Sequence, residues 1–281
     1  MELNEIYKRS MEKQKPMIKE IIIEIEDAIK AAFDAVIETN PTAYVLLVGR
    51  ADIVPELKGI TKTTCVIDYQ MDRYNDKTRE GFYLRYMNRR YNSDGFHYEG
   101  EEGIDDLFVE MMIYSHLWDS HYYLKTLKRI AGIISDGKYL WNVSIPERGK
   151  WNFMQDIISQ LKGNNLKLGD IIEKCYKSDI RNAFAHSLFD IDIDGRTITT
   201  QTNIGINKIS FDRFQEMFLY SVIVMNKMQI MQETLHDKVA SLSGPLTEVF
   251  ETPEGVHVQI FSEMVEFRNK KFPEFRIQIV D

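Results

Sequence analysis

The predicted architecture depends most on Lys174–Asp192, which reads KCYKSDIRNAFAHSLFDID and whose hydrophobic period changes part-way along. Across 168–188 the apolar residues follow one face of a helix. Over 189–200, isoleucines alternate with aspartates as in a half-buried strand, and Asp194-Gly195 is a strong signal for a hairpin turn. The sequence therefore predicts a helix over 168–188 that leads directly into a β-hairpin over 189–200.

Helical periodicity is also present on both sides of this stretch. Apolar residues recur every three or four positions over 104–135, 151–161 and 210–237. Together with 168–188, these segments predict an antiparallel bundle of about four helices across 104–240, with the hairpin inserted into it. The expected fold class is therefore mainly α.

The flanking regions have mixed patterns. Residues 1–103 predict an α/β region of unknown role, and 92–103 form the candidate boundary loop because they are rich in glycine and acidic residues. Residues 241–281 alternate between apolar and polar and predict a short β extension. The elements expected in these flanks are helices over 17–37 and 78–91, a strand-like segment at 44–48, a strand over 61–69, and two strands near 256–260 and 275–279.

Composition excludes several classes of protein. The chain has 281 residues, with 35 Lys+Arg against 43 Asp+Glu and a net charge of −8, so it does not bind nucleic acid through a global basic field. Cys65 and Cys175 are too few for a disulfide framework or a four-cysteine zinc site. Apolar runs are far below the roughly 20 residues of a spanning helix, and the charged N-terminus has no signal-peptide core. We expect a soluble cytoplasmic protein without a membrane partner.

Several familiar kinds of site are also disfavoured. No Walker-type GxxxxGK[ST], no GxGxxG and no G-x-S-x-G pattern occurs in the sequence. His116 and His121 lie five residues apart with Asp119 between them, whereas a zinc pair on one helix prefers a spacing of four. We expect no metal and no other cofactor, although either histidine could instead face the 168–188 helix and join a site there.

Three polar residues with complementary chemistry share one face of that helix. At about 100° per residue, Asn182 lies near 100° and His186 near 140° from Arg181 on a helical wheel. Ala185 falls between Arg181 and Asn182 and keeps the surface open, while Phe184 points away toward the predicted core. The pattern therefore predicts three functional groups that converge on one accessible face.

These residue types suit the cleavage of RNA without a metal. Histidine can move a proton near neutral pH, and arginine presents a planar fork that binds a phosphate and the charge that builds on it. His186 would take the proton of a ribose 2′-hydroxyl, whose oxygen then attacks the adjacent phosphorus, with Asn182 orienting the groups. A structural alternative stays open: Arg181 could pair with Asp179 or Asp190, and His186 could cap the end of its helix.

The R-N-A-F-A-H sequence over 181–186 resembles the signature of the HEPN superfamily (higher eukaryotes and prokaryotes nucleotide-binding domain). That signature is an arginine, a polar residue, three variable residues and a histidine on one helix of an α-bundle, and all three key positions are present here. The resemblance covers about 104–240. Nothing in 1–103 or 241–281 adds to it.

The resemblance implies a metal-independent endoribonuclease that works as a homodimer, in which two motif helices face each other across one composite cleft. It implies catalytic roles for Arg181 and His186 and a supporting role for Asn182. It also suggests a toxin or phage-defence effector, with an antitoxin or a nucleotidyltransferase as a possible partner. Other members of the superfamily only bind RNA, nucleotides or proteins, and this non-catalytic alternative stays open.

A second candidate RNA contact lies on the helix expected over 78–91, where arginines alternate with tyrosines. Guanidinium planes and aromatic rings contact the phosphates and bases of single-stranded RNA. The alternative, which we favour, is an amphipathic helix with a solvated basic edge. The residues proposed to contact RNA are Arg85, Arg89, Arg90 and Tyr86.

Overall fold

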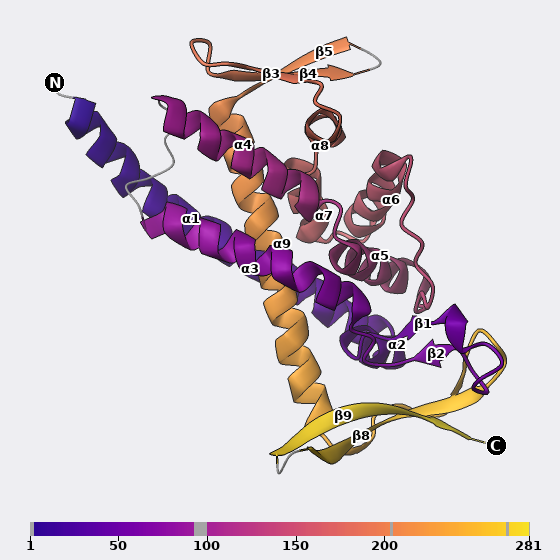
Figure 1. Ribbon diagram of the computed structural model, residues 1–281. Helices are drawn as coiled ribbons and strands as arrows, with labels where there is room; N and C mark the ends of the chain where they lie inside the picture. The colour runs from indigo at the N-terminus through magenta and orange to yellow at the C-terminus, as the bar shows by residue number, and fades with distance from the viewer. Residues whose placement is uncertain (1–2, 93–99, 203–204, 268–269, 281) are drawn as a thin grey trace. The chain divides into compact units, whose positions relative to one another are not determined.

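The computed structural model describes residues 3–92, 100–202, 205–267 and 270–280, and these are mostly helical (Figure 1). No helix among them is both long and apolar enough to cross a membrane. The helices are α1 (Leu3–Thr39), α2 (Pro41–Val48), η1 (Pro55–Leu57), α3 (Met71–Asn92), α4 (Gly100–Leu117), α5 (His121–Asp136), α6 (Lys150–Gly163), α7 (Lys167–Cys175), α8 (Ser178–Ala185) and α9 (Phe211–Ala240). The strands are β1 (Asp52–Ile53), β2 (Cys65–Val66), β3 (Phe189–Asp192), β4 (Thr197–Thr202), β5 (Gly205–Ser210), β6 (Gly244–Pro245), β7 (Phe250–Glu251), β8 (His257–Phe267) and β9 (Lys270–Ile279).

The chain forms two compact units, and each is assembled from three separate segments. Unit 1 comprises Met1–Ala28, Asn75–Ser120 and Asp170–Lys227, and unit 2 comprises Ile29–Tyr74, His121–Gly169 and Met228–Asp281. The units are interleaved along the chain, whereas the sequence predicted three consecutive regions at 1–103, 104–240 and 241–281. The candidate boundary loop at 92–103 lies largely outside the described residues.

Aromatic side chains form the centre of unit 1. The ring of Tyr114 on α4 meets Phe214 on α9 edge to face, with centroids 5.9 Å apart. Trp118 meets Tyr176 in the same way at 5.0 Å. All four residues are buried, so α4, the α7–α8 segment and the first part of α9 share one apolar core. Burial of large aromatic rings is the main stabilising contribution to such a core.

The helix expected over 104–135 is interrupted at Trp118–Ser120. α4 ends at Leu117 and α5 begins at His121, and the Ser120 hydroxyl donates a hydrogen bond of 2.6 Å to the Asp76 carboxylate. Asp and Ser side chains compete with the helical backbone for hydrogen bonds, which favours a break where they follow one another. Apolar periodicity runs on through the break, and it therefore predicted one helix where there are two.

The helix expected over 168–188 is also two helices, because Tyr176 and Lys177 leave the helical conformation. The buried hydroxyl of Tyr114 accepts a hydrogen bond from the Lys177 N–H at 2.7 Å and donates one to the Cys175 carbonyl at 2.8 Å. This side chain from another helix supplies partners for backbone groups that the break would otherwise leave buried without one. No local sequence pattern could have predicted that arrangement.

The predicted hairpin is present and gains a third strand. β3 pairs antiparallel with β4, and β4 pairs with β5, in the order β3-β4-β5. The first turn spans four residues, between Asp192 and Thr197, instead of the two of a tight turn. Arg196 completes this turn in the left-handed conformation, with φ of 50°. Asp194-Gly195 therefore marked the turn correctly but not its length.

In unit 2, the strand-like segment at 44–48 is the helix α2, so the predicted strand is wrong. Asn40 caps the helix through a bond of 2.9 Å from the Ala43 N–H, and Pro41 at the first helical position has a backbone angle suited to it. Five of the eight residues of α2 are buried, and apolar residues lie on every side of the helix. A helix that is hydrophobic all round has no amphipathic period and resembles a buried strand in sequence.

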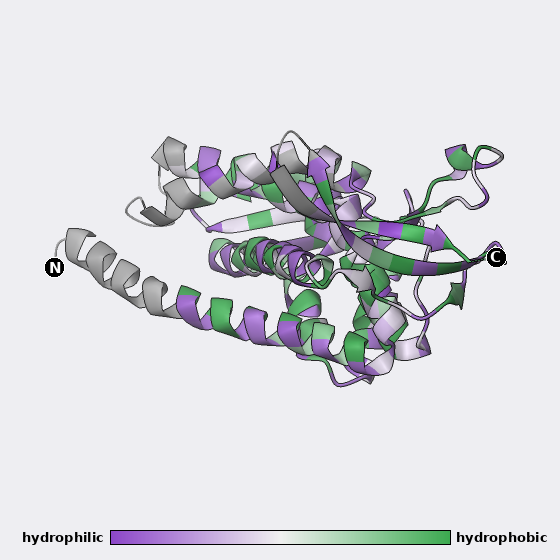
Figure 2. Ribbon diagram, turned by 90° about the horizontal axis from the view of Figure 1, so that it is seen from below, coloured by the Kyte–Doolittle hydropathy of each residue, from purple (hydrophilic) through white to green (hydrophobic). Residues whose placement is uncertain are grey.

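The remaining strands of unit 2 follow the prediction in part. The strand expected over 61–69 shrinks to β2, which pairs with β1 over two residues each. The two C-terminal strands are confirmed as β8 and β9, which pair antiparallel along their whole length, and β6 and β7 add short pairings to β8. The hydropathy colours of Figure 2 vary from residue to residue along these strands and along α1, as expected for elements with one buried face.

Candidate functional site

The candidate site lies at the end of α8, where the chain turns into β3. His186 is the C-cap of the helix, and the next residue, Ser187, adopts the left-handed conformation with φ of 54°. The Leu188 N–H donates to the Ala183 carbonyl at 2.8 Å, and the Ser187 N–H donates to the Phe184 carbonyl at 3.2 Å. This is the hydrogen-bond pattern of a Schellman motif, which fixes His186 at the helix end.

Arg181 is held by an ion pair that the sequence did not predict. Its Nη2 donates to Oδ1 of Asp119 at 2.5 Å, and its Nη1 donates to Oδ1 of Asn182 at 2.8 Å. Neither Asp179 nor Asp190, the partners considered from the sequence, forms this pair, and Asp179 instead accepts a bond from Asn207. The guanidinium is therefore fixed on two sides by two different oxygen atoms.

The Arg181 fork is only partly bonded. The Nε atom is buried and has no hydrogen-bond partner among the described residues. The side chain retains 17% of its exposed surface. Because an arginine fork has five donors in one plane, the two bonds observed leave capacity for a further anionic or carbonyl ligand at its exposed edge.

Asp119 is the residue that sequence reasoning missed. It was considered only as a spacer between His116 and His121, yet it lies in the break between α4 and α5 and binds Arg181, 62 positions away. The Ser115 hydroxyl, one turn earlier, donates to the Arg181 carbonyl at 3.4 Å and adds a second link between α4 and α8. The Asp119-Ser120 pair was a signal for a helix break, but only the fold shows what the carboxylate contacts.

The other two motif residues occupy the open face that the helical wheel predicted. Asn182, Ala185 and His186 are all exposed. Phe184 is half-buried and stacks on Phe189 of β3 with ring centroids 5.7 Å apart, so it anchors the helix to the sheet. The structure thus brings Arg181 and Asn182 into direct contact, and it places His186 one turn further along the same helix.

Two buried groups at the end of α7, Tyr176 and Cys175, do not titrate near neutral pH. Burial raises the pKa of the Tyr176 hydroxyl to about 12, although the charge of Arg181 acts in the opposite direction. Burial likewise raises the pKa of the Cys175 thiol to about 12, with a small opposing effect from its hydrogen bond with Ser221. Cys175 is therefore a packed apolar residue and not a nucleophile.

Of the residues on α3 that were predicted to contact RNA, Tyr86 is buried and Arg85 is exposed. Tyr86 is buried, and its hydroxyl donates toward Asp106 and Glu110, so its ring is not available to stack on a base. This prediction was wrong because Tyr86 belongs to the inward face of α3. Arg85 is exposed, while the side chains of Arg89 and Arg90 lie outside the described residues.

Within the described part of the chain, no group of three or more His, Cys, Asp or Glu side chains lies together as a zinc site would require. His116 is an exposed residue in the last turn of α4, and His121 is the exposed first residue of α5. The two histidines belong to different units and to different helices.

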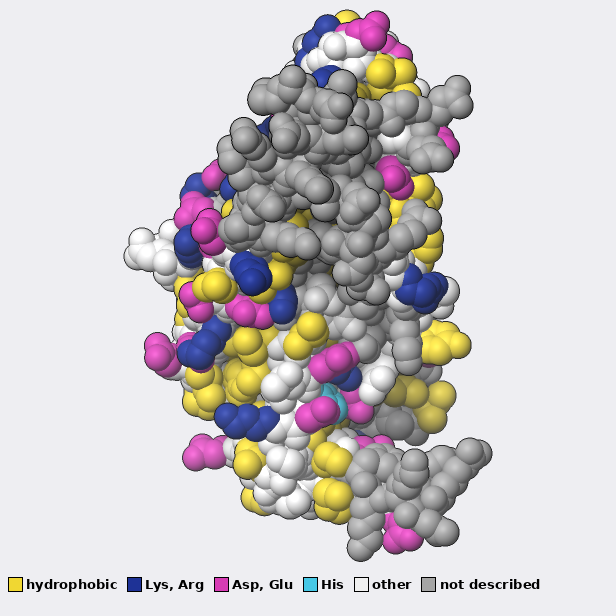
Figure 3. Space-filling model, turned by 90° about the vertical axis from the view of Figure 1, so that its left-hand side faces the viewer, with side chains coloured by type: hydrophobic (Ala, Val, Ile, Leu, Met, Phe, Trp, Pro, Cys, Tyr) yellow, Lys and Arg dark blue, Asp and Glu magenta, His cyan; other side chains and the backbone are white. Residues whose placement is uncertain are grey.

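The described surface drawn in Figure 3 carries both signs of charge. Lys and Arg side chains are interspersed with Asp and Glu side chains on this face. This distribution agrees with the net charge of −8 and does not supply a broad electrostatic attraction for nucleic acid there. Any nucleic acid would have to be bound by a local site.

Comparisons with protein-family models, with curated proteins and with solved structures gave no match for this chain. The chemistry of the candidate site is therefore inferred from its own residues and their geometry.

Proposed function

We propose that this protein is a metal-independent endoribonuclease of the HEPN type, with Arg181 and His186 as catalytic residues and Asn182 in support. One observation carries the proposal: Arg181 is held in place at a partly exposed position, with hydrogen-bonding capacity left over, on the same short helix as an exposed histidine. Preorganised donors of this kind stabilise charge that develops in a transition state.

The proposed reaction balances without any cofactor. His186 accepts the proton of the ribose 2′-hydroxyl, and the 2′-oxygen forms a bond to the adjacent phosphorus. The bond from phosphorus to the 5′-oxygen breaks, and this oxygen takes up a proton, which leaves a 2′,3′-cyclic phosphate and a 5′-hydroxyl end. Arg181 binds the phosphate oxygens whose negative charge increases during attack.

A homodimer would complete this chemistry. Each chain carries one His186 at the end of α8, and proton transfer in this reaction needs both a base and an acid. A second copy facing the first across a composite cleft would supply the second imidazole and a second Arg181. Only the resemblance of residues 181–186 supports a role as a toxin or phage-defence effector, with an antitoxin or nucleotidyltransferase as partner.

The non-catalytic alternative is favoured by the Asp119–Arg181 ion pair. An arginine that already pairs with a carboxylate and retains 17% of its exposed surface can serve to join α4 to α8. In that case the site would bind RNA, a nucleotide or a protein without cleaving RNA, and α8 would only present Asn182 and His186 as contacts.

Cleavage of labelled single-stranded RNA in the presence of EDTA tests the proposal. We expect His186→Ala to lower the cleavage rate by about 10²–10⁴-fold, the usual contribution of general acid–base catalysis. His116→Ala is the matched control, since His116 is an exposed histidine of the same unit that lies outside the motif. We expect the control to cleave at the wild-type rate. The RNA product of both proteins should end in a 2′,3′-cyclic phosphate.

Two results would contradict the enzymatic proposal. The first is a wild-type protein that binds the RNA and yields no product, which favours the binding module. The second is equal cleavage by wild type and by His186→Ala, which indicates a contaminating nuclease or another site. Thermal unfolding of each variant shows whether loss of activity reflects loss of fold.

A further inference from the structure

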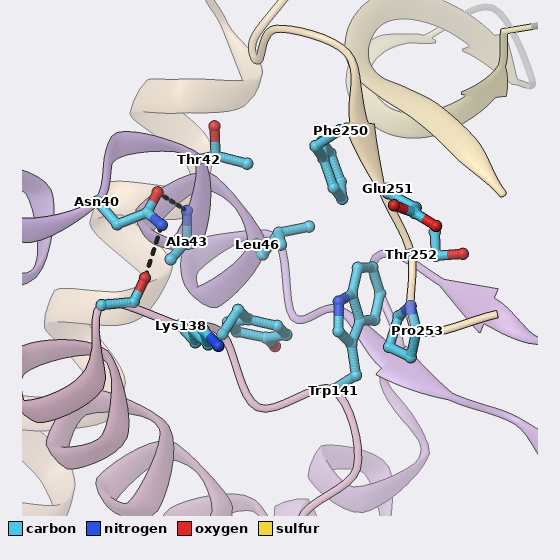
Figure 4. A pocket seen from close by; sticks show the side chains of 12 residues that line it. Asn40, Thr42, Ala43, Leu46, Lys138, Trp141, Phe250, Glu251, Thr252 and Pro253 are labelled. Atoms are coloured by element: carbon cyan, nitrogen blue, oxygen red, sulfur yellow. Dashed lines mark hydrogen bonds between the residues drawn. The ribbon is translucent and has the colours of Figure 1, made fainter. Parts of the chain in front are cut away.

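Unit 2 contains a hollow of about 470 Å³ that the motif chemistry does not use. Its volume lies in the range of roughly 300–1,000 Å³ that is usual for small-molecule sites. It is built from three segments: the start of α2, the loop that follows α5, and the chain from β7 into the next turn (Figure 4). All of its lining residues belong to unit 2.

Aromatic rings form one wall of this hollow. Trp141 and Phe250 stack with an angle of 24° between their planes and centroids 6.4 Å apart. Tyr139 meets Trp141 edge to face at 5.5 Å. Figure 4 shows Phe250 and Trp141 on one side of the hollow, with Thr42 and Lys138 on the other. Trp141 is only 7% exposed and backs the wall, so the half-buried Phe250 is the ring on which a flat aromatic ligand can stack, a contact worth about 1–3 kcal/mol per base.

The aromatic wall is held rigidly from behind. The buried Arg129 donates to the carbonyl of Leu140 at 3.0 Å and to that of Trp141 at 3.1 Å. At the near end of the loop, the Asn40 side chain donates to the Gly137 carbonyl at 2.9 Å. The hollow is therefore preorganised and does not have to form when a ligand arrives.

Polar groups of three kinds surround the aromatic wall. Lys138 is exposed and positively charged, and Thr42 lies in the first turn of α2 and carries a hydroxyl that can donate a hydrogen bond to a phosphate oxygen. Glu251 is exposed on the opposite segment and can accept hydrogen bonds from hydroxyl groups. A ligand that satisfies all three has a flat ring, sugar hydroxyls and a phosphate.

We propose that this hollow binds a nucleotide, with its base against Phe250, its ribose hydroxyls toward Glu251, and its phosphate toward Lys138 and the Thr42 hydroxyl. The nucleotide is either a free mononucleotide or one residue of an RNA strand, since both present the same ring, sugar and phosphate. This site does not include Arg181 or His186, so its test is independent of the test of the proposed ribonuclease activity.

Calorimetric titration of the full chain with AMP, with adenosine and with a short RNA oligonucleotide tests the proposal. We expect saturable binding of AMP or of the oligonucleotide that weakens about tenfold or more in Lys138→Glu, because one charge-assisted bond to the phosphate is replaced by repulsion. Lys238→Glu is the matched control, an exposed lysine of the same unit that does not line the hollow, and should bind within about twofold of wild type.

The ligands distinguish the two sources of the nucleotide. Binding of AMP identifies a free mononucleotide, and Lys138-dependent binding of the oligonucleotide alone identifies a nucleotide within RNA. The proposal is overturned if no ligand binds, if adenosine binds as tightly as AMP, or if Lys138→Glu binds as wild type does. Because Lys138 is exposed, Lys138→Glu should stay folded, which its circular dichroism spectrum checks. The His186→Ala variant should bind normally, so failure of the ribonuclease proposal leaves this result unaffected.

Discussion

Two arginines, Arg129 in unit 2 and Arg181 in unit 1, each pair with an aspartate that is distant in sequence, and they differ in how completely they are bound. The side chain of Arg129 retains 8% of its exposed surface, and it contacts the Asp52 carboxylate and two backbone carbonyls. Arg181 contacts one carboxylate and one side-chain amide, retains 17% of its exposed surface, and has a buried Nε without a partner among the described residues.

The difference separates an arginine that supports the fold from one that can also bind a ligand. A buried guanidinium that binds a carboxylate and two backbone carbonyls is closed to substrate, and removing it leaves those groups without a donor. A guanidinium that is anchored but only partly bonded is oriented and still able to bind. The position of Arg181 beside exposed Asn182 and His186 agrees with the second role.

The largest expected effect is on the stability of unit 2. Arg129→Met keeps the aliphatic stem and removes the guanidinium, so the Asp52 carboxylate loses one partner and the carbonyls of Leu140 and Trp141 lose a donor. We expect the free energy of unfolding to fall by about 3 kcal/mol or more, measured by chemical denaturation. Lys128→Met is the control, because Lys128 pairs with the exposed Asp156 and should cost about 1 kcal/mol or less. Equal losses for both variants would contradict the structural role of Arg129.

A change at Arg181 should affect activity more than stability. Arg181→Lys keeps the positive charge and loses the planar fork, so the ion pair with Asp119 can persist while phosphate contact is impaired. We expect RNA cleavage to slow by about 10–100-fold with a smaller loss of stability than in Arg129→Met. Cleavage rates and unfolding curves are measured on the same preparations of wild type, Arg181→Lys and Arg129→Met. A variant with normal cleavage and a large loss of stability would make Arg181 a second arginine that only supports the fold.

The smallest effect is expected for Asp119, which acts through Arg181. Asp119→Asn keeps the shape and one hydrogen-bonding oxygen but removes the charge that orients the guanidinium. We expect cleavage to slow by about tenfold, with Asp119→Glu recovering part of the rate. Asp179→Asn is the control, because Asp179 lies on the same helix and binds Asn207 instead of Arg181. If Asp119→Asn cleaves at the wild-type rate while Asp179→Asn does not, the positioning role belongs to Asp179.

Parts of the fold could be predicted because their causes are local. The helical periods over 104–135, 168–188 and 210–237 identified buried faces correctly, and the change of period at 189 identified the β-hairpin. The C-terminal strands were predicted for the same reason. The two helix breaks could not be predicted, because a break needs partners for the backbone groups that it exposes, and those partners come from distant residues. The helix α2 could not be recognised because it is apolar on every side.

The sequence by itself determined that Arg181, Asn182 and His186 share one face of a helix, because helical geometry fixes the direction of neighbouring side chains. Only the tertiary structure decided which carboxylate holds Arg181. Asp179 and Asp190 are near in sequence, yet Asp119 forms the pair because the packing of α4 on α8 places the start of the α4–α5 break beside the guanidinium. Tertiary packing also forms the hollow of unit 2, because Trp141 and Phe250 lie more than a hundred residues apart and meet only in the folded chain.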